Sequence, residues 1–284
     1  MNHQGNRPFK AAAMLIGLLI LISAAEACRK KNYSYDLSAN LYVANNVVFV
    51  ERGLVHTFNL LLKTNMNPAI RRDGVGIIDK AIIHFDTSAN LITIKYQNNI
   101  CADSVVRNGQ IFIRMSGDFF STGTVAILYF YKYSEDGRQF AGTDSLVNLG
   151  APAGGRCSYK SFIDSLVIKQ DSGSNSTWHS EFQYNIPSVL KLPSDSINPV
   201  IITGTAGGWT DEGYNFTLEI SIPLVNRIYC PWIREGVQQV SIPALEISSG
   251  SIEYVNMASC NNRVTYRFGS SMFEWWINKK KLIF

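Results

Sequence analysis

The five cysteines carry the most distinctive chemistry in this 284-residue chain. Cys28 stands near the N-terminus, and the others are Cys101, Cys157, Cys230 and Cys260. Cysteines that bind zinc usually come in close pairs, about two to four residues apart. No two cysteines here lie closer than 30 residues. The sequence therefore predicts no metal site.

Catalytic motifs are also missing from the sequence. It contains no metalloprotease helix motif, nucleophile elbow, phosphate-binding loop or dinucleotide fingerprint, so we expect no cofactor. No serine or cysteine partner is recognisable by motif for any of three histidines, His56, His84 and His179. We expect a binding or assembly module that is not an enzyme.

Paired carboxylates keep one enzymatic alternative open. Asp211 with Glu212, or Glu181 with Glu219, can converge only in space, and two such carboxylates can hydrolyse a glycosidic bond. A carbohydrate-active enzyme is therefore the alternative, and carboxylates that simply face water are the simpler interpretation.

One turn combines an aromatic ring with carboxylates. Trp209 lies close in sequence to Asp211, Glu212 and Tyr214. An exposed ring can stack on a sugar while neighbouring polar groups bind its hydroxyls. These four residues are our predicted glycan-binding group, although core packing is the commoner role of large aromatic residues.

The first 27 residues predict a signal peptide. Arg7 and Lys10 precede an uncharged apolar run, residues 11–24, which has the length of a signal peptide and is too short to span a bilayer. Residues 21–28 then resemble a bacterial lipobox, in which the cysteine after the cleavage site is lipidated. Ala25 and Glu26 depart from that pattern, so an ordinary cleavage site before Cys28 is the alternative.

The lipobox resemblance implies that Cys28 carries a lipid anchor in the outer membrane and that residues 28–40 form a tether. The lipid bilayer is then the first partner. Arg29 and the two lysines after it are basic, unlike the acidic surface-export signal known for such lipoproteins. We therefore expect the protein to face the periplasm.

If the protein is exported, its other four cysteines lie in an oxidising compartment. Four cysteines in an oxidising compartment predict two disulfides, with three possible connectivities. Residues 94–103 and 252–261 form a weak internal repeat in which a strand leads into a cysteine-bearing loop. If the two units are related by symmetry, Cys101 pairs with Cys260 and Cys157 with Cys230.

The body of the chain alternates apolar and polar residues in short runs. Period-two alternation is clear in residues 177–184, 216–224 and 263–268, and residues 125–133 are almost continuously apolar, as in a strand covered on both faces. Turn signals separate the runs. We predict a single all-β domain, residues 41–284, built as an antiparallel sandwich or as open barrel-like sheets.

Residues 44–63 break this pattern. Their apolar residues recur at helical intervals, with polar Glu51, Arg52 and His56 between them. We predict one amphipathic helix that packs on a face or edge of the sheet.

Composition narrows the class of protein further. The chain is 46% hydrophobic and 17% charged, which excludes a disordered chain. Its formal charge of +4 comes from scattered Lys and Arg rather than from one basic element, so we expect no nucleic-acid partner. An envelope protein or a glycan is the expected partner besides the bilayer.

Several segments resemble a group of uncharacterised all-β lipoproteins from Bacteroidota. They are residues 96–109, 202–207, 222–233 and 260–262. The resemblance implies the same fold and export route, and it implies no activity, because the group has none assigned.

A second resemblance concerns modification. Four Asp-Ser-aliphatic triplets look like the O-glycosylation acceptor of exported Bacteroidota proteins, with the serines Ser104, Ser145, Ser165 and Ser196 as acceptors. Asp-Ser is also ordinary turn chemistry, so chance matches are the alternative.

Overall fold

The computed structural model describes residues 7–151, 156–170, 172–187, 199–254, 260 and 262–277, with side chains from Ser34 onward except that of Arg156. Ser196 and residues 255–259 lie outside this part. The described part contains two helices and 14 strands. Their bounds are α1 Arg7–Met66, α2 Pro68–Asp73, β1 Val75–Ile78, β2 Ala81–Asp86, β3 Leu91–Ile100, β4 Val106–Met115, β5 Val125–Glu135, β6 Arg138–Gly150, β7 Arg156–Lys169, β8 Asn175–Pro187, β9 Pro199–Trp209, β10 Asn215–Arg227, β11 Ile233–Ser241, β12 Ser249–Tyr254, β13 Arg263–Phe268 and β14 Ser271–Trp276.

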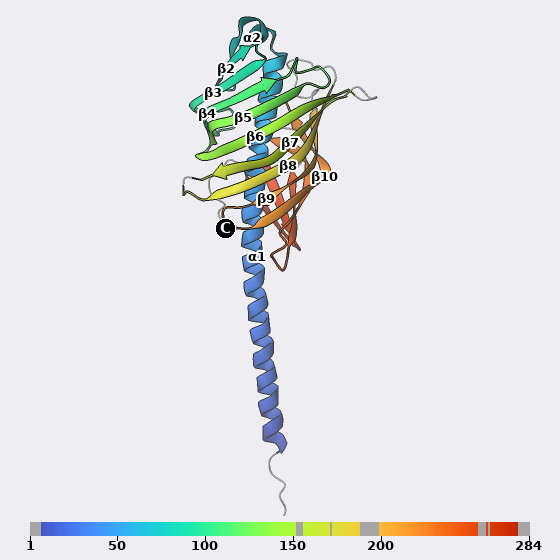
Figure 1. The fold of residues 1–284 in the computed structure, drawn as a ribbon. Helices are drawn as coiled ribbons and strands as arrows, with labels where there is room; N and C mark the ends of the chain where they lie inside the picture. The colour runs from blue at the N-terminus through green and yellow to red at the C-terminus, as the bar shows by residue number, and fades with distance from the viewer. Residues whose placement is uncertain are drawn as a thin grey trace, which may run out of the picture.

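All 14 strands form one antiparallel sheet, and each pairs with the next strand along the chain. The sheet curls around the C-terminal half of α1, while the N-terminal half of this helix projects beyond it (Figure 1). The sheet is not closed, and β1 and β14 are its two edges. The predicted all-β class with one N-terminal helix is confirmed, in the open barrel-like form.

The alternation of each strand explains this enclosure. In β8, Trp178, Phe182 and Tyr184 are buried, whereas His179 and Glu181 are exposed. The apolar side of every long strand therefore faces α1 and covers it. Phe58 on the helix stacks on Tyr184 with 4.2 Å between ring centroids.

Helix α1 is longer and more completely buried than the sequence predicted. It spans Arg7–Met66 instead of residues 44–63, so it also runs through the expected tether, residues 28–40. No side chain from Ala39 to Met66 is exposed. The helix has no polar face toward solvent in this segment, because Glu51, Arg52 and His56 point at sheet residues that bond to them. Within the described part of the chain, no helix is long and apolar enough to cross a membrane.

Polar side chains fix how far along the helix the sheet sits. Near the start of the enclosed segment, Asn40 donates to the carbonyl of Ile247 and accepts from the Tyr266 hydroxyl. At the other end, the Asn59 amide donates to Asn226 at 2.6 Å. A helix that slid or turned would leave these buried groups without partners, which is costly.

The strongest of these contacts is a buried ion cluster. Glu135 on β5 accepts from Arg52 of the helix at 2.9 Å and from Arg107 of β4 at 2.9 Å. Arg107 also forms two bonds to Asp103, at 2.8 and 2.6 Å. Burial acts to raise the pKa of Glu135, but Arg107 and Arg52 outweigh it and hold that pKa well below its usual range. The carboxylate is therefore charged inside the protein.

Strand β5 departs from its predicted environment. Its apolar residues predicted coverage on both faces, but Ile127, Tyr129 and Tyr131 are 49%, 48% and 44% exposed. With a single sheet around one helix, only the inner face of a strand is covered.

Among the described cysteine side chains, one disulfide is present where two were predicted, and the pairing expected from the internal repeat is wrong. Cys230 pairs with Cys260, with 5.7 Å between Cα atoms, whereas Cys101 and Cys157 are free thiols. The expected pairing assumed symmetry between two cysteine loops. In the meander, the connections after β10 and β12 are separated by only two strands, but the β3–β4 turn with Cys101 lies far along the sheet from Cys260.

We predict that Glu135→Ala lowers the free energy of unfolding by about 3 to 5 kcal/mol, because the buried Arg52 loses its direct carboxylate partner and Arg107 keeps only Asp103. Glu274→Ala, which breaks the more exposed pair with Arg263, should cost less than about 1 kcal/mol. Urea unfolding measures both. Equal losses would show that the buried cluster does not hold the helix.

A second prediction concerns pH. Burial raises the pKa of Glu51 to about 7, despite hydrogen bonds from Gln238 and Tyr254. The folded protein then holds a proton that the unfolded chain, with its carboxyl near 4.5, releases. The bound proton therefore stabilises the folded protein in full below pH 4.5. This stabilisation is lost, at about 1.4 kcal/mol per pH unit, as the pH rises from 4.5 through 7.

Glu51→Gln should remove that loss, since its amide stays neutral. Urea midpoints at pH 5 and pH 8 should therefore differ less in the variant than in the native protein. Asp144, whose pKa burial also raises to about 7, keeps its own contribution in both proteins. An equal difference between the pH 5 and pH 8 midpoints in the variant and in the native protein would contradict the prediction.

Candidate functional site

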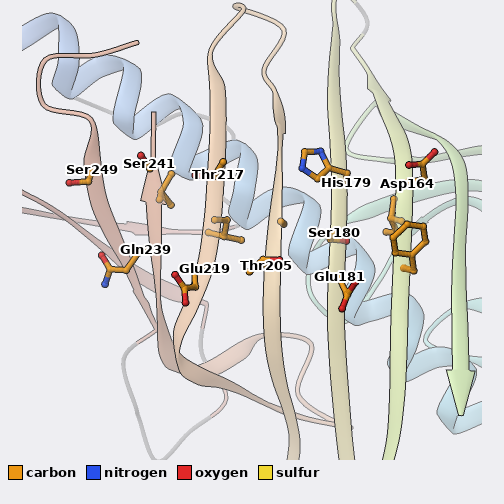
Figure 2. Close-up of a pocket in the computed structure, with 15 residues that line it drawn as sticks. Asp164, His179, Ser180, Glu181, Thr205, Thr217, Glu219, Gln239, Ser241 and Ser249 are labelled. Atoms are coloured by element: carbon orange, nitrogen blue, oxygen red, sulfur yellow. The ribbon is translucent and has the colours of Figure 1, made fainter. Parts of the chain in front are cut away.

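A trough of about 730 Å³ crosses the outer face of the sheet from β7 to β12 (Figure 2). Its floor follows a row of small residues that pair across neighbouring strands. Thr217 of β10 pairs with Ser241 of β11, and Ser241 pairs with Ser249 of β12. Because these short side chains meet in register over three strands, the surface is hollow there.

Longer side chains form one wall of the trough. In the next row, Phe162, Glu181, Thr205, Glu219 and Gln239 pair in that order from β7 to β11. Figure 2 shows Glu181, Thr205 and Glu219 on three neighbouring strands. The wall therefore presents carboxylates and an amide beside the hydroxyls of the floor.

His179 and Asp164 lie at the β7–β8 end. A shift in register between Ile163 and Leu166 leaves Asp164 exposed on the outer face. His179 pairs with Gly207, and a Cβ atom on Gly207 would come within 2.8 Å of the His179 Nε2 atom. The imidazole thus covers a glycine that has no room for a side chain.

Trp209 lies on the outer face of β9, outside the group of residues that line the trough. It follows Gly207 by two residues on β9, pairs with Thr177 and Asn215, and is 53% exposed. Residues two apart on a strand face the same way, so its ring stands on the trough's side of the sheet. None of the four predicted glycan-binding residues lines the trough, and Trp209 is the one whose strand position faces the same side of the sheet.

The Asp211 carboxylate is hydrogen-bonded to other side chains of the protein. Its carboxylate accepts from the Tyr42 hydroxyl of α1, and from Gln170, Ser174 and Ser176 at 2.7, 3.1 and 3.3 Å. Burial and this bond raise the pKa of Tyr42. Asp211 thus ties the helix to the β7–β8 and β9–β10 turns, a role that the sequence did not reveal.

The other two predicted glycan-binding residues lie in the same turn. Glu212 is exposed. Tyr214 donates to the Tyr35 hydroxyl at 3.2 Å and packs edge-on against Tyr42 with 6.5 Å between ring centroids. Tyr214 therefore supports the turn that carries Trp209.

Of the two carboxylate pairs considered for catalysis, only Glu181 and Glu219 line the trough. Both pair with Thr205 from opposite sides, so their backbones lie about 10 Å apart at a strand spacing of about 4.8 Å. Glu181 forms an ion pair with Lys160 at 2.7 Å. Glu219 and Asp164 have no ion pair in the part of the chain that the structure describes.

The predicted modification sites lie in different environments. Ser104 is exposed in the β3–β4 turn, Ser165 is exposed on β7, and Ser145 is half-buried on β6. Ser196 lies outside the described residues. Cys28 belongs to helix α1, and its side chain also lies outside them. Glycosylation and lipidation stay predictions.

No group of three or more His, Cys, Asp or Glu residues among those described is arranged to hold a metal ion. Comparison with family models, curated proteins and solved structures finds no match for this chain. The site is therefore interpreted from its own geometry.

We predict that Asp211→Ala lowers the free energy of unfolding by about 1 to 3 kcal/mol, because several buried or half-buried donors lose their acceptor. The matched control, Glu212→Ala, removes the exposed carboxylate next to it and should change stability by less than about 0.5 kcal/mol. Hydrogen exchange of the 170–175 and 210–214 turns should rise only in the first variant. Equal exchange in both would contradict the role given to Asp211.

Proposed function

We propose that the protein is a lipid-anchored envelope module that binds a saccharide in the trough and does not turn it over. The observation that carries this proposal is the row Thr217, Ser241 and Ser249, whose hydroxyls line the trough on the face of the sheet that also carries the exposed ring of Trp209. Ligand sites combine a concave surface, an aromatic contact and a few polar groups in this way.

The chemistry of the lining favours a ligand rich in hydroxyls. The floor hydroxyls both donate and accept hydrogen bonds, and the carboxylates of Glu181 and Glu219 accept from sugar hydroxyls. Together with Asp164 they make the trough acidic. A neutral or amine-bearing sugar suits it, and an acidic sugar or a nucleic acid is repelled.

The anchor and compartment rest on sequence features. The lipobox-like segment supports a lipid on Cys28, with the bilayer as partner and the periplasmic side of the outer membrane as location. The Cys230–Cys260 disulfide suits an oxidising compartment. Resemblance to uncharacterised Bacteroidota lipoproteins supports the same placement.

A carbohydrate-active enzyme is the second candidate, because Glu181 and Glu219 face one trough. Their backbones lie about 10 Å apart, and the carboxyl groups of inverting glycosidases are about 6.5 to 9.5 Å apart. Glu181 is bound to Lys160 and its side chain is 55% exposed. Such an open carboxylate fits binding better than proton donation.

Thr217→Tyr tests the binding site. It places a ring over the floor at an exposed strand position, so binding should weaken by more than about tenfold without loss of fold. Thr143→Tyr is the matched control, because Thr143 is exposed on β6 outside the trough lining. Calorimetric titration with glucosamine, glucose and galacturonate tetrasaccharides should give the first two as ligands and exclude the third.

Two results would contradict the proposal. One is that no tetrasaccharide binds the native protein, and the other is that Thr217→Tyr binds as well as Thr143→Tyr. Cleavage of a tetrasaccharide that stops in Glu181→Gln or Glu219→Gln would instead establish the enzyme.

A further inference from the structure

The trough lies at the end of the sheet from which α1 emerges. Ser241 and Ser249 flank the loop 242–248, and this loop is bonded to the helix. The Ile247 amide donates to Asp36 at 2.8 Å, and Asn40 donates to the Ile247 carbonyl at 3.1 Å. One end of the trough is thus fixed to the first buried turns of α1.

The β9–β10 turn, between two middle strands of the trough, is fixed to the helix in the same way. Asp211 bonds to Tyr42, and the β9–β10 turn that contains it directly follows Trp209. Because Asp36 and Tyr42 bind the turns beside the trough, their distances from Cys28 along the helix give the height of the trough above Cys28.

Helix α1 sets that height. Asp36 is eight residues after Cys28 and Tyr42 is 14 after it, which places them about 12 and 21 Å along the axis at a rise of about 1.5 Å per residue. The polar layer on each side of a bilayer is about 5 to 8 Å thick. With a lipid on Cys28, the trough starts just above the headgroups.

The helix is also suited to hold this height. It runs unbroken through residues 28–52, and that segment contains neither Gly nor Pro, which are frequent causes of sharp kinks. The far end of the helix, Met66, is 38 residues from Cys28 and therefore about 57 Å away. A ligand arriving from a distance would meet that end first.

We infer that the trough binds the saccharide headgroup of a glycolipid in the same membrane that holds the Cys28 anchor. This inference rests on the proposed function, since it needs both the anchor and a saccharide site. Trp209 and the floor residues face sideways above the bilayer, where a headgroup projects. Anchor and ligand then share one membrane, so binding gains from a high effective concentration.

A change in helix length tests the inference. Seven helix-forming residues inserted between Lys31 and Asn32 raise the body by about 10 Å and turn it by only about 20°. A Gly/Ser insertion of the same length is the matched control, because a flexible linker lets the body return to the surface. The full mature, lipidated protein is placed in phosphatidylcholine vesicles that contain a lipid bearing a glucosamine tetrasaccharide.

The measured quantity is the fraction of glycolipid at half-saturation. It should rise by about tenfold or more with the helical insertion and change little with the flexible one, because only the rigid spacer prevents contact. Soluble glucosamine tetrasaccharide should bind all three proteins equally. An unchanged half-saturation with the helical insertion would overturn the inference while leaving the saccharide site intact. Absence of soluble binding in every protein would instead overturn the proposed function.

Discussion

Every buried polar group on helix α1 must find a partner, and the rest of the structure depends on how the sheet meets this requirement. A helix enclosed from Ala39 to Met66 cannot turn its charged residues to water. Arg52 meets Glu135, Glu51 meets Gln238 and Tyr254, and His56 meets Tyr96. Burial and the nearby Arg107 lower the pKa of His56 to about 3, so it stays neutral. These partners fix the position of the helix within the sheet.

Because the sheet encloses the helix, its inner and outer faces have different roles. The inner face of each strand is committed to the helix, so residues on the outer face are free to vary. The trough uses that freedom, with small residues aligned across β10 to β12. Its position is still controlled from inside, because Asp211 and Ile247 bind α1 next to the trough.

The local patterns in the sequence predicted much of the fold. Period-two alternation located β8, β10 and β13, and helical spacing located part of α1. These local patterns could not show that Glu51 and Arg52 are buried, because their partners are 83 or more residues away. The pairing of Cys230 with Cys260 was missed because it depends on the order of strands in the sheet, which no local pattern shows. Thr217, Ser241 and Ser249 form no motif, and only strand register brings them together. Trp209 was singled out because an aromatic ring beside a polar turn is a local signal, and the structure places it at the end of β9.

The central claim is that strand register builds a saccharide site on the outer face of a sheet held by its enclosed helix. A crystal structure of the protein with glucosamine tetrasaccharide tests it most directly. The account predicts sugar rings lying along the row from His179 to Ser249, with one ring against Trp209. Sugar bound elsewhere, or an empty trough at saturating concentration, would contradict it.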